Sequence, residues 1–435
     1  MYKEKLLQDL VKSYDWLTRN KLVHDDYLLD SLPRPYLSIK GKQYVSFCSN
    51  NYLGLSHNPK VLDAAEKAVK KFSIGTCESR KLGGNLYLLE DLEKEIAKFK
   101  GTESSMIFAT GLMANVGVIS ALTDVIFYMN LFHNWEEDDS QSVIMTDQLN
   151  HRSIQMGIKL SHAKVCKYNH SDMDQLEHLL HSNRDKKILI VTDGVFSMDG
   201  DLANLPKITT LAEKYQATVM TDDAHGSGVW GETGKGSAEH FGVEDKIQIK
   251  MGTLSKAFGA MGGFVAADEK IIKMLKVNTS TYYFTSSLPA EQAAGLIEAT
   301  KIIHYESEDL RKQIWKNSYM FIKGCLDAGF NIPLQISQII PVMIGKEDLC
   351  IKAEQSLMRK GVLVSSAMSP AVAPGTARLR ATINATHTKA DIEQLLSGLA
   401  YVHKKIGLPR INYTQTEIQN FENQIPTYIR NFIEN

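Results

Sequence analysis

The chain has 435 residues, of which 43% are hydrophobic and 23% are charged, a balance typical of a globular protein that excludes a largely disordered chain. Its length predicts two lobes rather than one domain. The 49 basic and 50 acidic residues nearly cancel, so no overall field attracts nucleic acid or an anionic membrane. Any bound anion must therefore be held by local geometry.

The N-terminal residues mix charged and apolar side chains at helical spacing, and no apolar run reaches the roughly 18 residues that a membrane span needs. We expect neither a signal peptide nor a membrane span. The cysteines are far apart and form no C-x-x-C pair, which suits a reducing cytoplasm and indicates neither zinc nor a redox dithiol. There are five: Cys48, Cys77, Cys166, Cys325 and Cys350.

Between about residues 60 and 290, short β-branched apolar runs alternate with longer segments of helical period. This alternation predicts an α/β fold with a mostly parallel sheet and crossover helices. Leu88–Lys100 places its apolar residues on one helical face, and Gly101 follows as a stop signal. The predicted strands are Met106–Phe108, Ser142–Thr146, Ile188–Thr192, Thr218–Thr221, Ile247–Met251 and Gly263–Ala266.

The chain after about residue 290 has a different organisation. Two long helical stretches, Ala290–Ala328 and Glu347–Lys360, surround short strands and predict a smaller α+β domain. Tyr128–Ser140 has no period and is expected to be an inserted loop. The predicted division is an N-terminal arm (1–45), a large domain (46–290), a small C-terminal domain (291–405) and a C-terminal extension (406–435).

Asp222 and His225 follow the predicted strand Thr218–Thr221. Ligands of α/β proteins bind at the carboxyl ends of parallel strands. A carboxylate there can keep a pyridine nitrogen protonated and so make a heteroaromatic cofactor an electron sink. A hydrogen-bonded loop and a metal-binding pair remain open for this cluster alone.

Lys256 follows the next strand and is flanked by Thr253 and Ser255. A partly desolvated lysine has a lowered pKa and becomes a nucleophile for a carbonyl, while the hydroxyls suit a phosphate. A surface lysine is the ordinary interpretation of one isolated Lys. The nearby Asp222–His225 cluster favours the nucleophile.

Two helix starts complete a possible cofactor site. Gly111 and Leu112 begin a helix after a strand, where backbone N–H groups receive phosphate. His151 begins another, where an imidazole can stack on a ring. Each is also compatible with simple packing. Gly226–Gly231 matches G-x-G-x-x-G, but we reject a dinucleotide site because the segment does not directly follow its strand and no helix follows it.

From about Tyr44 to Ala400, the sequence resembles the α-oxoamine synthases, a family that includes 8-amino-7-oxononanoate synthase, glycine C-acetyltransferase and serine palmitoyltransferase. Many specific stretches occur in one order. They are Ser49–Leu55, Asp193–Gly200, Asp222–Gly226, Gly252–Gly259, Phe284–Pro289 and Pro374–Arg380.

The resemblance implies a fold-type-I transferase that depends on pyridoxal 5′-phosphate (PLP), with Lys256 holding the cofactor as a Schiff base and later acting as a base. Arg378 would clamp the amino acid carboxylate with Asn50 nearby, and Arg380 is the alternative clamp. No metal is expected. The other implied cofactor contacts are Asp222 to the ring nitrogen, His225 to the phenolic oxygen, His151 on the ring face, Ser197 beside it, Thr253 with the backbone of Gly111 and Leu112 at the phosphate, and Ser286 from a neighbouring subunit.

The implied activity is a decarboxylating condensation of alanine, glycine or serine with an acyl-CoA or acyl-carrier-protein thioester, carried out by a homodimer with shared sites. An aminotransferase on the same fold is one alternative, although we would then expect tyrosine where this chain has His225. A non-catalytic subunit is another, and retention of Lys256 argues against it. Glu78 and Leu89 depart from the family pattern and leave the substrates open.

Overall fold

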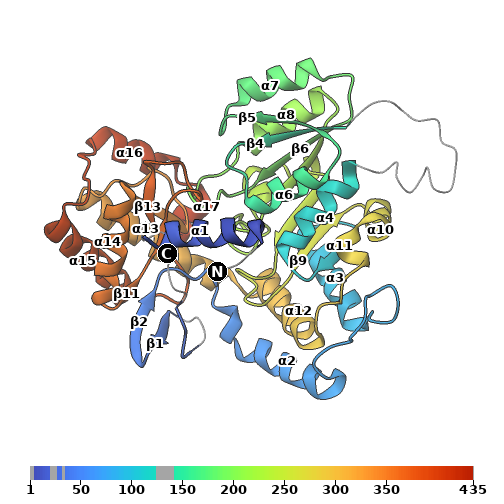
Figure 1. Ribbon diagram of the computed structural model, residues 1–435, viewed down its shortest axis with the longest axis horizontal. Coiled ribbons are helices and arrows are strands. Elements are labelled where there is room, and N and C mark those ends of the chain that lie inside the picture. The colour runs from blue at the N-terminus through green and yellow to red at the C-terminus, as the bar shows by residue number, and fades with distance from the viewer. Residues whose placement is uncertain (1–3, 20–26, 32–34, 124–141, 435) are drawn as a thin grey trace.

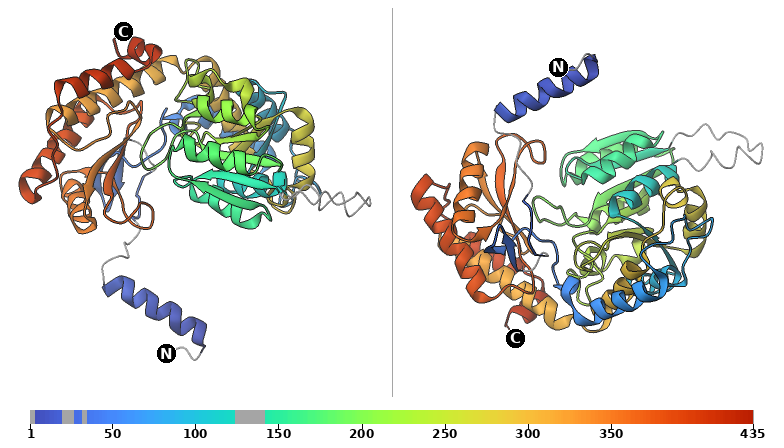
Figure 2. Two further views of the ribbon diagram at one scale, coloured as in Figure 1. Left: turned by 90° about the horizontal axis from the view of Figure 1, so that it is seen from above. Right: turned by 60° about the horizontal axis from the view of Figure 1, so that its bottom comes forward.

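The computed structural model describes residues 4–19, 27–31, 35–123 and 142–434. The predicted insertion Tyr128–Ser140 lies outside the described residues. Two lobes lie side by side (Figure 1), and α1 (Lys5–Arg19), which buries no side chain, is set apart from both of them (Figure 2). No helix in the described part of the chain is long and apolar enough to cross a membrane.

The large lobe is built on a seven-stranded sheet with the order β3-β9-β8-β7-β6-β4-β5. Only β9 runs antiparallel to its neighbours, so the sheet is mostly parallel, as predicted. The strands are β3 (Ser104–Phe108), β4 (Val143–Asp147), β5 (Lys164–Tyr168), β6 (Ile188–Asp193), β7 (Thr218–Asp222), β8 (Ile249–Thr253) and β9 (Gly263–Ala267).

Helices cover both faces of this sheet, and alternate side chains of each strand pack on opposite faces. On β6, Leu189 and Val191 join the apolar cluster under α4 and α6, whereas Ile188 and Ile190 join the cluster under α7 and α8. The helices are α2 (Pro59–Phe72), α3 (Tyr87–Lys100), α4 (Gly111–Thr123), α6 (Arg152–Leu160), α7 (Met173–Ser182), α8 (Leu205–Lys214), α9 (Ser237–Phe241), α10 (Glu269–Asn278), α11 (Ser280–Tyr283) and α12 (Ala290–Tyr305).

The six predicted strands are all present, although the one expected at Ile247–Met251 is shifted to Ile249–Thr253. The predicted helix Leu88–Lys100 is α3, and Gly101 ends it with a left-handed φ of 64°. β5 was not predicted. It is the edge strand, and its short sequence Lys-Val-Cys-Lys-Tyr is largely exposed, so it lacks the apolar run by which the central strands were identified.

The small lobe contains two three-stranded sheets, ordered β10-β13-β12 and β1-β2-β11. The hairpin of β1 and β2 thus pairs the beginning of the chain with β11. The elements are β1 (Tyr36–Ile39), β2 (Lys42–Ser46), β10 (Ile339–Gly345), β11 (Val362–Leu363), β12 (Ser365–Ala367), β13 (Ala377–Thr382), α13 (Glu308–Asp327), α14 (Glu347–Arg359), α15 (Lys389–Ile406), α16 (Gln415–Gln424) and α17 (Thr427–Glu434).

The helical stretch predicted at Ala290–Ala328 is wrong as one unit, because it consists of α12 and α13 with a break at Ser307. The Ser307 hydroxyl donates to the carbonyl of Ile303 at 2.6 Å and so competes with the backbone N–H that would continue the helix. Before the break, α12 packs on α2 and α3 of the large lobe; after it, α13 packs on α15 and α17.

Candidate active site

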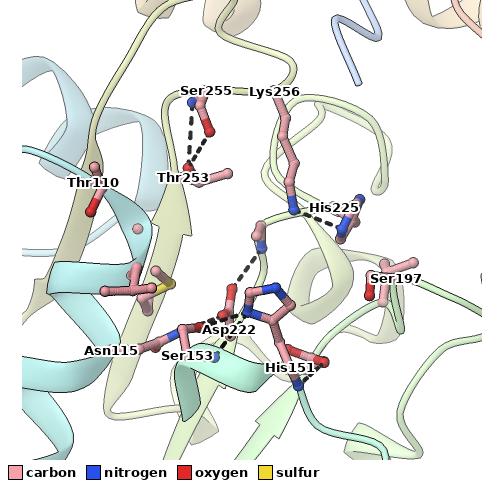
Figure 3. A pocket seen from close by; sticks show the side chains of 16 residues that line it. Thr110, Asn115, His151, Ser153, Ser197, Asp222, His225, Thr253, Ser255 and Lys256 are labelled. Atoms are coloured by element: carbon pink, nitrogen blue, oxygen red, sulfur yellow. Dashed lines mark hydrogen bonds between the residues drawn. The ribbon is translucent and has the colours of Figure 1, made fainter. Parts of the chain in front are cut away.

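A cavity of about 210 Å³ lies where the carboxyl ends of β4, β6, β7 and β8 approach the start of α4 (Figure 3). This is the edge of a parallel sheet at which ligands bind. The lining residues are Thr110, Gly111, Leu112, Asn115, His151, Ser153, Asp193, Val195, Ser197, Asp222, Ala224, His225, Met251, Thr253, Ser255 and Lys256.

Lys256 points its amine across the cavity toward His225, and the Nζ to Nε2 distance is 2.7 Å (Figure 3). Burial lowers the pKa of Lys256 to about 8, although Asp222 acts in the opposite direction. Burial, together with Lys256 and Arg380, also lowers the pKa of His225 well below its usual value. His225 is therefore neutral, and its Nε2 shares a hydrogen bond with the lysine amine.

A chain of hydrogen bonds continues from His225 into the small lobe. His225 Nδ1 lies 2.6 Å from the hydroxyl of Tyr52, which in turn lies 3.3 Å from Asn50 Oδ1. Asn50 Oδ1 also accepts from Arg380 at 3.3 and 3.4 Å. Burial raises the pKa of Tyr52 to about 12, so its hydroxyl keeps its proton. The chain connects the Lys256 amine to a buried guanidinium.

Asp222 lies at the bottom of the cavity and is 3% exposed. Its carboxylate accepts from Asn115 Nδ2 at 2.6 Å and from the backbone of Ala224 at 3.0 Å. Burial and the charge of Asp222 raise the pKa of neighbouring Asp193 well above its usual value. Asp193 is therefore protonated, and the Asp222 carboxylate is the negative charge that suits a cation in the cavity, such as a protonated ring nitrogen.

His151 caps the N-terminus of α6, and its Nδ1 accepts from the backbone N–H of Ser153. The Ser153 hydroxyl lies 2.7 Å from the same nitrogen and accepts from Asn115 at 2.8 Å. Burial lowers the pKa of His151. The side chain is thus a neutral, oriented ring beside Asp222, suited to stack on a flat cofactor (Figure 3).

The end of the cavity away from Asp222 suits a phosphate. α4 begins at Gly111, and the first N–H groups of a helix have no partner within it. The hydroxyls of Thr253 and Ser255, 2.9 Å apart, lie at the same end (Figure 3). A Cβ on Gly111 would lie 3.1 Å from Thr253 Oγ1 and 3.2 Å from Met251 Cε, so glycine keeps this end open.

The residues present fit three polar groups of PLP: a buried carboxylate for the ring nitrogen, a helix start with two hydroxyls for the phosphate, and an amine with a lowered pKa for the aldehyde. Of the predicted site residues, those that line the cavity are Gly111, Leu112, His151, Ser197, Asp222, His225, Thr253 and Lys256.

Four predicted residues do not line the cavity, among them the alternative clamp Arg380, which donates to Asn50. Arg378 forms an ion pair with Asp199 and donates to the carbonyl of Thr376. Asn50 reaches the site through Tyr52. Ser286 forms a β-bridge with Ser79 of its own chain.

Sequence reasoning missed several residues that organise the site. Tyr52 and Asp193 lie inside the recognised motifs Ser49–Leu55 and Asp193–Gly200, and Asn115 lies in the helix predicted to begin at Gly111, but their roles were not predicted. Ser153, which orients His151, and Gln338, whose amide donates to the carbonyl of His225 at 2.7 Å, had no local signal. Their contacts depend on tertiary structure.

Comparisons with known proteins agree with this geometry. The family model described as aminotransferase class I and II matches residues 42–399. The 8-amino-7-oxononanoate synthase of Petrotoga mobilis is 41% identical over 382 residues, which cover 87% of this chain and 93% of that protein. The synthase of the same name from Geotalea daltonii is 41% identical over 85% of this chain and 91% of its own.

Among solved structures, serine palmitoyltransferase of Sphingomonas wittichii superposes with a TM-score of 0.85 and 28% identity, over 94% of this chain and 100% of that chain. The fold-type-I architecture and the predicted family are thereby confirmed. The chain belongs to the aminotransferase class I and II family and, within it, to the α-oxoamine synthases, PLP-dependent acyltransferases that condense an amino acid with an acyl thioester.

Proposed function

We propose that the enzyme makes 8-amino-7-oxononanoate from alanine and the thioester of a seven-carbon dicarboxylic acid, with release of carbon dioxide. The carbon count of the product supports this pair. Alanine without its carboxyl group supplies the amine-bearing carbon and the methyl group, and the remaining seven carbons end in a carboxylate. The observation that carries the proposal is the 41% identity to synthases of this name, against 28% to the serine palmitoyltransferase.

When bound, PLP supplies an electron sink that stabilises negative charge on the α carbon of the amino acid. The residues proposed to hold it are Asp222 at the ring nitrogen, His151 on the ring face, His225 at the phenolic oxygen, and Gly111, Leu112 and Thr253 at the phosphate. Ser255, which lies beside Thr253, is added to the phosphate set because its hydroxyl lines the same end of the cavity.

Lys256 is proposed as both anchor and base. Because burial lowers its pKa to about 8, its amine gives up its proton at neutral pH far more readily than that of a lysine of ordinary pKa. Its Nζ takes the proton from the α carbon of the amino acid and later returns one. His225 Nε2, 2.7 Å away, orients that nitrogen.

The proposed reaction forms one carbon–carbon bond and breaks the thioester and carboxylate bonds. The α carbon attacks the thioester carbonyl and expels the thiolate, the carboxylate leaves as carbon dioxide, and the α carbon is reprotonated. The structure favours Arg380 over Arg378 as the group that binds the carboxylate. Arg380 contacts Asn50 and acts electrostatically on Lys256, whereas Arg378 is already paired with Asp199.

The assembly is proposed to be a homodimer in which Ser286 of one subunit reaches the phosphate of the other. The segment that carries Ser286 is exposed at Phe284, which is 74% accessible in the single chain. A cytoplasmic location is also part of the proposal, and the five free cysteines are compatible with it.

The test is a visible absorption titration of the PLP-loaded enzyme with alanine, glycine and serine, followed by addition of acyl-CoA thioesters. We expect alanine to perturb the cofactor band at the lowest concentration. Carbon dioxide should then be released from carboxyl-labelled alanine only with the seven-carbon diacid thioester. Preference for serine with a long-chain acyl-CoA would contradict the proposal and favour the activity of the structural neighbour.

A further inference from the structure

The two C-terminal helices, α16 and α17, lie beyond residue 399, where the match to the aminotransferase class I and II model ends. They are nevertheless firmly attached to the molecule. Their apolar side chains Phe421, Ile425, Ile429 and Phe432 are buried in the main hydrophobic cluster, and α17 packs along α13. The extension is therefore an integrated part of the fold.

Tyr428 carries the contact between this extension and the large lobe. Its hydroxyl accepts from the backbone N–H of Gly231 at 3.1 Å and lies 3.2 Å from Nδ1 of His240. Burial lowers the pKa of His240 to about 4, so that ring is neutral and shares a hydrogen bond with the hydroxyl. Burial also raises the pKa of Tyr428, which keeps its proton.

Gly231 belongs to the loop of residues 226–236, which follows His225 directly; we name it the cofactor loop. Gly231 has a left-handed φ of 89°, and a Cβ there would lie 2.0 Å from the Glu239 carboxylate. Within the loop, Gly228 donates to Gly234 and Gly236 donates to Trp230. The loop has no regular secondary structure, so its position depends on such contacts.

A second set of contacts leads from Tyr428 back to the active site. The His240 ring meets Trp230 edge-on, with centroids 5.0 Å apart. Trp230 Nε1 donates to Gln338 Oε1 at 3.0 Å, and Gln338 Nε2 donates to the carbonyl of His225 at 2.7 Å. Trp230 is thus connected through Gln338 to the backbone carbonyl of His225, the histidine that contacts Lys256.

We propose that the C-terminal extension holds the cofactor loop in place and that Tyr428 is a positioning residue for PLP binding. Tyr428 contacts Gly231 and His240, and its effect on His225 passes through Trp230 and Gln338. The inference depends on the PLP site and not on the substrate pair proposed above. A wrong choice of substrates would therefore leave it standing.

The test compares Tyr428→Phe with Tyr413→Phe in the full-length chain. Deleting the whole extension would expose the apolar residues that it covers, so the point variant is the sharper probe. Tyr413 is a matched control from the same extension. Its hydroxyl accepts from the N–H of Ile332 at 2.8 Å and lies 3.0 Å from the carbonyl of Phe330, both in the small lobe.

The dissociation constant of PLP is measured by titrating the apoenzyme, and the visible circular dichroism of the bound cofactor is recorded per mole bound. Without the Tyr428 hydroxyl, the free enzyme no longer holds the cofactor loop at Gly231, and PLP binding must order it. We therefore expect Tyr428→Phe to weaken PLP binding by up to about 5- to 10-fold, the equivalent of one buried hydrogen bond, and to reduce the visible signal. Tyr413→Phe should lower the melting temperature comparably and leave both cofactor readouts unchanged. Equal effects of the two variants, or unchanged PLP binding by Tyr428→Phe, would overturn the proposal.

Discussion

Arg378 and Arg380 lie two residues apart on β13 and therefore on the same face of the strand. Both are buried, and their partners distinguish them. Arg378 is paired with Asp199, whereas Arg380 donates to Asn50, Thr382 and the carbonyl of Ser197. The sequence motif alone does not show which arginine binds the carboxylate, because their different partners come from segments that are distant in the sequence.

Replacement of each arginine tests this assignment. Arg380→Met should raise the dissociation constant for alanine about 10- to 100-fold, because it removes charged hydrogen bonds to the carboxylate. The KM for the thioester should change far less. Arg378→Met serves as the control and should leave alanine affinity within a fewfold of the parent. A larger loss in Arg378→Met, measured in the same spectroscopic titration, would return the role to Arg378.

At the scale of elements, His170 joins the ends of two strands. Its Nδ1 lies 3.1 Å from Asp147 at the end of β4, and its Nε2 lies 2.7 Å from Asp201 in the loop after β6. That loop carries Ser197, which lines the cavity. Burial opposes the charge, but Asp147 and Asp201 outweigh it and raise the pKa of His170 to about 10. The imidazolium thus holds the loop at neutral pH.

The stabilisation by His170 depends on pH because the pKa of this histidine is higher in the folded chain than in the unfolded chain. In the unfolded chain histidine titrates near 6.5, so the stabilisation is complete below about pH 6.5 and is lost as pH rises toward 10. His170→Gln should lower the melting temperature by about 2–4 °C at pH 6, and the difference should shrink by pH 9.5. His178→Gln, at an exposed position on α7, is the control. A difference that stays constant with pH would contradict the ion-pair account.

At the scale of the whole molecule, the pattern of the sequence predicted six of the seven strands of the large sheet, and eight of the residues proposed for the site line one cavity. Buried parallel strands such as β6 are continuous apolar runs, and the residues that follow them meet at one edge. The edge strand β5 was missed because its sequence is charged and largely exposed and contains no apolar run. The break at Ser307 was missed because it depends on one side-chain hydrogen bond. The roles of Arg380 and Tyr428 depend on contacts between distant segments, which a local pattern does not contain.

The last expectation concerns the second copy of the chain. Ile74, Leu82 and Phe284 are 79%, 75% and 74% exposed, and their two segments are joined by the Ser79–Ser286 bridge and by a 2.8 Å hydrogen bond between Thr76 and Ser287. Large apolar side chains gathered at one exposed place indicate an interface. The same segment carries Ser286, so assembly and phosphate binding should be linked.

Light scattering tests the link. The parent enzyme should have about twice the 48.7 kDa mass of one chain. Phe284→Asp should shift it toward the monomer and weaken PLP binding in parallel, because a buried charge is costly and the neighbouring Ser286 loses its target. Leu160→Asp, at a residue that is 61% exposed at the end of α6, is the control and should change neither property. A parent enzyme that is monomeric at working concentration and binds PLP fully would show that each site is complete within one chain.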